Sequence, residues 1–156
     1  MEINIGIAKK NRLEMAKLLN HTLASEYVLY TKTWKFHWNV EGKHFGALHL
    51  FLDEQRKQLA EIIDTIAERI RALDVKADGT LTEFREKSSL AEHPGKNPDD
   101  LSMIKLLLKD HEQVIRKMHE DCNYSLELDD IGTNNLLADL IEKHEKMAWM
   151  LRAFLG

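Results

Sequence analysis

Apolar residues recur at every third or fourth position over most of the chain, and this spacing constrains the fold more than any other feature. It places one apolar stripe along an α-helix, whereas a half-buried strand needs strict alternation. Only 7 glycines and 2 prolines interrupt the 156 residues, so long helices are favoured. The sequence predicts an all-α protein with a single domain over residues 1–156, a length that suits one hydrophobic core.

Four long helices are expected, over about residues 8–36, 43–73, 101–122 and 136–154, with a turn at 129–133. The third follows Asn97-Pro98-Asp99-Asp100, because proline and carboxylates suit a first helical turn. A connection over 74–98 contains a short extra helix, Leu81–Arg85. A long crossover between the second and third helices favours a ferritin-like four-helix bundle over an up-down-up-down bundle.

The two N-terminal helices have clear core stripes. In the first helix the stripe is Leu13, Ala16, Leu19, Leu23, Tyr27, Tyr30 and Trp34. In the second helix the stripe is Leu48, Leu52, Gln55, Leu59, Ile62, Ile66, Ile70 and Leu73.

A polar line runs beside the core stripe of the second helix. His49 and Asp53 are four residues apart, as are Asp64 and Glu68, so each pair shares a helix face. The eleven residues from Asp53 to Asp64 are close to three turns, and all four side chains therefore point the same way. A solvated face is the ordinary explanation of a carboxylate pair. It accounts poorly for this line, because acids four apart repel without lysine partners.

Distance separates the two pairs. At about 1.5 Å per residue their centres lie roughly 22 Å apart, so one metal site cannot use both pairs of the same helix. A two-fold axis near the helix midpoint solves this, because it lays the helix antiparallel against its copy. The small side chains of Ala60 and Ala67 permit a close approach, and the first helix can add His37. The sequence thus predicts two equivalent sites between two subunits.

The ligand set selects the metal. Two imidazoles and three carboxylates suit iron, manganese or zinc, and no thiolate favours copper. The set is too rich in carboxylates for a structural zinc site. Iron is the expected metal for redox work, as a two-iron site, with zinc or manganese as surrogates.

These residues lie in segments that closely resemble the Dps family of mini-ferritins. The matching segments are Lys35–Gly42 (KFHWNVEG), then Phe45, Leu48, His49, Phe51 and Asp53, then Asp64–Arg69 (DTIAER), and near the end His144–Ala153. The family's ferroxidase pattern maps onto five residues with every spacing intact: His37, His49, Asp53, Asp64 and Glu68. The resemblance extends over the whole chain.

The resemblance implies a dodecameric shell built from two-fold dimers. It also implies ferroxidase sites at the dimer interfaces, which oxidise ferrous iron, preferably with hydrogen peroxide, so that ferric oxide is stored and the cell is protected from oxidative damage. Trp38 resembles the family's tryptophan near the site, as a hydrogen-bond donor or electron relay. Capping of the core at the end of the first helix is an equally good interpretation of Trp38.

Other polar residues have simpler interpretations. Glu41 and His44 form the only Glu-x-x-His of the chain, and Gly42 makes it a poor helical ligand pair, which argues against a di-iron centre within one subunit. The remaining helical histidines and the single cysteine are expected to be packing or surface residues: His111, His119, His144 and Cys122. Candidates for an acidic iron pore are Asp129, Asp130 and Asp139, although helix capping explains the first two nearly as well. Asn135 replaces the acid usual in the family, so the pore is expected to be less negative.

A DNA-condensing protein with a mainly structural metal site is the alternative function. The chain has only Lys9, Lys10 and Arg12 near its start and no basic tail, and its net charge is −4. Twelve copies would repel phosphate, so DNA binding is not expected. A single cysteine and no apparent signal peptide favour the cytoplasm, and no apolar run is long enough for a membrane span.

Overall fold

The computed structural model describes residues 3–156, which form five α-helices and, within that range, no β-strand. Four helices are long and one is short: α1 (Lys9–Asn39), α2 (Phe45–Ala72), α3 (Leu81–Lys87), α4 (Asp100–Glu127) and α5 (Ile131–Ala153). The predicted all-α fold, with a short extra helix between the second and third long helices, is confirmed. None of the described helices is both long and apolar enough to cross a membrane.

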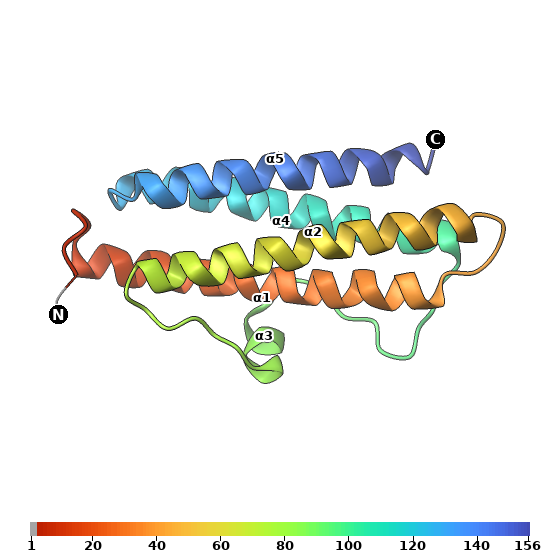
Figure 1. Ribbon diagram of the computed structural model, residues 1–156, viewed down its shortest axis with the longest axis horizontal. Helices are drawn as coiled ribbons and strands as arrows, with labels where there is room; N and C mark the ends of the chain where they lie inside the picture. The colour runs from red at the N-terminus through yellow and green to blue at the C-terminus, as the bar shows by residue number, and fades with distance from the viewer. Residues whose placement is uncertain (1–2) are drawn as a thin grey trace.

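The four long helices lie side by side in one bundle (Figure 1), with α1 against α2 and α4 against α5. The chain from α2 to α4 returns along the length of the bundle and carries α3, which packs on α1. The α1–α2 loop and the start of α4 therefore lie at the same end of the bundle (Figure 1). The end of α1 and the start of α2 meet at this end, and there the candidate ligands His37 and His49 come together.

Burial of α2 follows its apolar period. Every residue of the predicted stripe is buried: Leu48, Leu52, Gln55, Leu59, Ile62, Ile66, Ile70 and Leu73. In α1 the predicted stripe is buried only at Ala16, Leu19 and Leu23; its later members Tyr27, Tyr30 and Trp34 are half-buried, and Leu29, Thr33 and Phe36 take the core positions of that half. Leu13 is 51% exposed, and the neighbouring Arg12 is buried instead, with its Nη1 donating to the Leu73 carbonyl over 3.0 Å.

Two helix boundaries show how local chemistry sets the ends. Thr80 and Glu83 form a capping box at the start of α3, as each side chain accepts a hydrogen bond from the backbone N–H of the other. The predicted turn at 129–133 exists but is placed too far along the chain, because α4 ends at Glu127 and α5 already begins at Ile131. Asp130 caps it by accepting a 2.9 Å hydrogen bond from the Thr133 N–H.

Three ionisable side chains meet in the dry centre of the bundle. Glu26 of α1, His111 of α4 and His144 of α5 are each fully buried. His144 Nδ1 lies 2.9 Å from His111 Nδ1, and its Nε2 lies 2.9 Å from Glu26 Oε1, although this second contact is not aligned as a hydrogen bond. Burial, and secondarily the charge of His144, lowers the pKa of His111 well below its usual range. Two of the three histidines predicted to be packing or surface residues are thus core residues.

Candidate metal centre

His37 near the end of α1 and His49 near the start of α2 form a reciprocal pair. His37 Nδ1 donates to the His49 carbonyl over 2.7 Å, and His49 Nδ1 donates to the His37 carbonyl over 2.9 Å. The two rings stack with centroids 3.9 Å apart. Because a carbonyl can only accept, both Nδ1 atoms carry a proton, and in the neutral imidazole Nε2 is then the nitrogen with the lone pair. The pair therefore offers two imidazole nitrogens suited to a metal ion.

Aromatic side chains surround this pair. Phe45 stacks on the His49 ring at 5.1 Å. Trp38, the residue after His37, is 63% exposed and lies 4.8 Å from Trp34, centroid to centroid. Its exposure argues against the core-capping interpretation of Trp38 and leaves its indole available to a group outside the bundle.

Asp53, one helical turn after His49, is bound by two cations of its own helix. Its Oδ1 accepts from Arg56 Nη2 at 2.7 Å and Nε at 3.2 Å, and its Oδ2 lies 2.6 Å from Lys57 Nζ. Hydrogen bonds from Lys57 and then Arg56 lower the pKa of Asp53 to about 2. The expectation that these carboxylates lack cationic partners is wrong for Asp53. Sequence reasoning missed Arg56, although its position three residues on was a visible signal.

Asp64 and Glu68 lie on the same helix and are exposed. The helix rise separates them from His49 and Asp53 by roughly 22 Å, centre to centre. Within residues 3–156 no group of three or more His, Cys, Asp or Glu side chains is arranged to hold a metal ion. Within one chain His37 and His49 thus contact each other, Asp53 lies one turn further along α2 with Arg56 and Lys57 as its partners, and Asp64 and Glu68 lie apart from all three.

The remaining candidates have structural roles. His44 Nδ1 lies 2.6 Å from Asp100 Oδ2 at the start of α4, and this contact lowers the pKa of Asp100. Cys122 is half-buried and donates to the Asn134 carbonyl at 3.5 Å, and burial raises the pKa of its thiol.

Asp130 does not fit an iron pore. Its side chain is fully buried, where it accepts from Arg69 Nη2 at 2.5 Å and from Thr133 Oγ1 at 2.6 Å. Asp139 is exposed and paired with Lys143 at 2.8 Å, and Asp129 is exposed. The capping interpretation is therefore correct for Asp130, and only Asp129 and Asp139 remain available to a pore.

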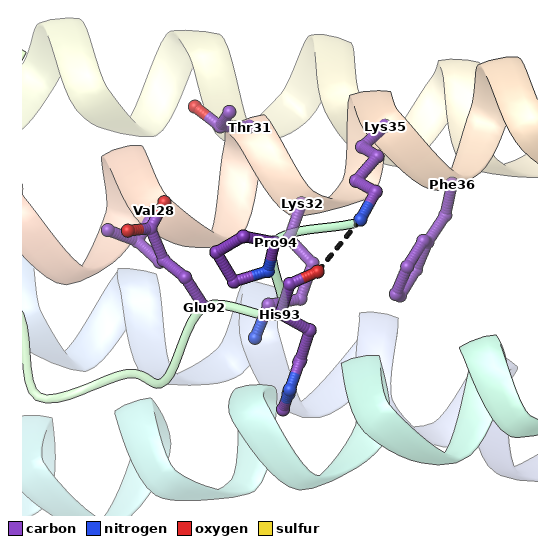
Figure 2. A pocket seen from close by; sticks show the side chains of 8 residues that line it. All are labelled: Val28, Thr31, Lys32, Lys35, Phe36, Glu92, His93 and Pro94. Carbon is purple, nitrogen blue, oxygen red and sulfur yellow. Dashed lines mark hydrogen bonds between the residues drawn. The ribbon is translucent and has the colours of Figure 1, made fainter. Parts of the chain in front are cut away.

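A hollow of about 190 Å³ lies between α1 and the crossover (Figure 2). Its lysines are already occupied, because Lys35 Nζ donates to the His93 and Lys96 carbonyls, and Lys32 Nζ pairs with Asp110 and the Ala91 carbonyl. These bonds tie the crossover to α1. They account for the lysines as anchors of the loop rather than as ligands of a bound molecule.

Known proteins resemble the chain over its whole length. A family model for the ferritin-like domain matches residues 16–156. DpsC of Streptomyces coelicolor superposes with a TM-score of 0.97 at 30% identity, covering 100% of this chain and 91% of that one. The chain belongs to the Dps family of ferritin-like proteins.

Two further relatives extend this family context. A low-temperature-induced protein of Nostoc sp., itself uncharacterised, is 42% identical over 98% of this chain and 86% of its own length. The Dps protein of Vibrio cholerae O1 has a TM-score of 0.94 and 30% identity, covering 100% of this chain and 98% of its own, and is described as one of the ferritin-like diiron-carboxylate proteins. The Dps-family fold thus agrees with the fold expected from the sequence.

Proposed function

We propose that this protein is a mini-ferritin that oxidises ferrous iron at sites shared by two subunits and stores the ferric oxide in a dodecameric cage. The observation that carries the proposal is the split ligand set of α2. His37 and His49 contact each other where α1 ends and α2 begins, Asp53 follows one turn further along α2, and Asp64 and Glu68 stand exposed about three turns beyond Asp53 on the same face. An antiparallel copy of α2 completes both halves at once.

The chain supplies binding and charge for this chemistry. Two imidazole nitrogens and three carboxylates hold two ferrous ions, the substrate, and the anionic oxygens favour the ferric product over the ferrous substrate. Each of the two ions gives one electron, and one hydrogen peroxide takes both, so that with two protons it leaves as two waters. The description of the Vibrio cholerae relative as a diiron-carboxylate protein supports iron as the metal.

The neighbouring residues have defined parts in the proposal. The reciprocal hydrogen bonds fix the rings of His37 and His49 in one rotamer each, so each Nε2 is already oriented to bind a metal ion. Trp38 stands exposed beside His37 and acts as a hydrogen-bond or electron donor to the site. Asp129 and Asp139, exposed near the start of α5, draw cations toward the cage interior.

Removal of either half of the ligand set tests the proposal. His49→Ala, and separately Asp64→Ala with Glu68→Ala, abolish rapid ferrous oxidation by peroxide, followed by ultraviolet absorbance, while size exclusion still finds an assembled cage. Glu54→Ala is the matched control, because Glu54 is an exposed carboxylate on a neighbouring face of α2. Wild-type rates in the assembled His49 or Asp64/Glu68 variants contradict the site assignment.

A further inference from the structure

Both carboxylate oxygens of Asp53 have a cationic partner on the same helix. Arg56 holds Oδ1 through two nitrogens, at 2.7 and 3.2 Å, and Lys57 Nζ lies 2.6 Å from Oδ2. A carboxylate that ligates a dication must give up these partners or share its oxygens with them. The cost of binding a metal ion at Asp53 therefore includes the loss of an ion pair.

The two cations differ in how firmly they are held. The Lys57 side chain is 64% exposed, so its charge is screened by water and its long chain is free to leave. The Arg56 side chain is only 18% exposed, and its guanidinium carbon lies 4.7 Å from the centre of the Trp34 ring. This contact with an aromatic face anchors the guanidinium on the α1 side of the ion pair. Arg56 is thus the lasting competitor for Asp53.

We propose that Arg56 sets the metal affinity of the site by occupying Asp53 until a dication displaces it. This inference rests on the proposed function, because it needs Asp53 to be a ligand. Loss of the Arg56 guanidinium is expected to raise the metal affinity, because two effects act in the same direction. Removal of the guanidinium frees the carboxylate, and it also removes a unit positive charge that repels the incoming ion.

The same geometry allows the Arg56–Asp53 ion pair to form again after the metal ion has left. The guanidinium stays anchored on Trp34 when the ion takes Asp53, so it remains close to the carboxylate. When the ion leaves for the cage interior, the ion pair reforms without any backbone movement. Arg56 thereby favours the emptying of the site after each turnover as well as opposing its filling.

Zinc, a redox-inert ion, is the probe for this inference. Titration calorimetry of the metal-free assembled protein measures the Zn²⁺ affinity of the wild type and of Arg56→Gln, Arg56→Lys and Lys57→Gln. Arg56→Gln binds Zn²⁺ about tenfold more tightly, the size of one unit charge acting on a dication across several ångströms of water-like dielectric. Arg56→Lys keeps the charge but loses the two-nitrogen hold on Asp53 and the planar contact with Trp34, so it gains affinity, but less than Arg56→Gln. Lys57→Gln gains less than about threefold, because its ion pair is exposed.

Thermal unfolding of the metal-free proteins and size exclusion verify that each variant is folded and assembled. Binding by Arg56→Gln that equals or is weaker than that of the wild type overturns the inference, because the arginine would then position Asp53 rather than compete for it. A wild type that binds no Zn²⁺ overturns the proposed function together with the inference. The two failures are therefore distinguishable in one set of titrations.

Discussion

His37 and His49 are held in place by each other, since the Nδ1 of each ring donates to the backbone carbonyl of the other residue, at 2.7 and 2.9 Å. The bonds join the end of α1 to the start of α2 across the turn between them. Because both rings are fixed by backbone groups, their orientation depends on the fold and not on a metal ion. The imidazoles are therefore preorganised in the absence of metal.

His37→Phe tests this preorganisation. Phenylalanine keeps a ring against His49, where the imidazoles stack at 3.9 Å, but it has neither the Nδ1 donor nor the Nε2 ligand. We expect Zn²⁺ affinity to fall at least about tenfold while the cage stays assembled. Titration calorimetry measures the change, and Phe45→Leu, which alters an aromatic neighbour of His49 without removing a ligand, serves as the control. Equal losses in both variants would assign the effect to packing.

Acid should weaken the bundle through His111. Burial lowers the pKa of His111 far below 6.5, so the unfolded chain takes up a proton near pH 6.5 that the native core does not. The free energy of unfolding therefore falls as the pH drops below about 6.5, by up to ~1.4 kcal/mol for each pH unit from this group, and no such loss occurs above that pH. Urea unfolding at fixed protein concentration, at a series of pH values from 7.5 to about 5, measures the slope.

The same cluster supplies the comparison variants. His144 of α5 contacts His111, and Glu26 of α1 contacts His144 in turn. His111→Leu removes the buried histidine, so it lowers stability at every pH but flattens the slope below pH 6.5. His119→Leu is the comparison variant, because it removes an exposed histidine of the same helix. An unchanged slope in His111→Leu would show that another group takes up the proton.

Asp130 should be far more important to stability than Asp129. Asp130→Ala leaves Arg69 without its partner at 2.5 Å and removes the cap of α5, so we expect a loss of about 3–5 kcal/mol. Asp129→Asn should stay within about 0.5 kcal/mol, because Asp129 is exposed and asparagine tolerates its φ of 58°. Chemical unfolding compares the two. Similar losses would contradict the structural role assigned to the Asp130–Arg69 pair.

The sequence predicts the fold well wherever one helix period repeats for many turns. All eight residues of the α2 stripe, from Leu48 to Leu73, are buried, because a long period averages out local exceptions. At the end of a helix only one turn is available, so a single local exception changes which residue is buried. At the start of α1 the core position is Arg12, whose guanidinium bonds a carbonyl, and not the apolar Leu13.

The start of α5 shows why turn signals mislead. The turn predicted over 129–133 includes Gly132, which lies inside α5, where a Cβ would come within 2.8 Å of Arg69 Nη2. A larger residue there would require the Arg69 guanidinium, which is paired with Asp130, to shift, and no local pattern reveals this long-range contact. In the same way, the cluster of Glu26, His111 and His144 joins three helices, and only the packed bundle brings it together.

At the candidate site, the spacing of the ligands within α2 could be predicted from the sequence. The anchoring on another helix of the cation that competes for Asp53 could not. The positions of His49, Asp53, Asp64 and Glu68 follow from the helix period alone. The i+3 spacing of Arg56 from Asp53 is visible in the sequence, but the packing of its guanidinium on the Trp34 ring of α1 is not. Contacts of this kind between two helices are set by tertiary packing, so they appear only in the folded structure.

The central claim, that each site is shared between two chains, is tested most directly by mixing two inactive variants. One variant lacks His49 and Asp53, and the other lacks Asp64 and Glu68, so either alone loses half of every site. In a mixed dimer one site receives both intact halves and the other receives neither. Equal amounts, unfolded and assembled together, should recover about a quarter of the activity of wild type treated in the same way if pairing is random. No recovery, despite mixed dimers proven by mass spectrometry, would contradict the shared site and place the ligands within one chain.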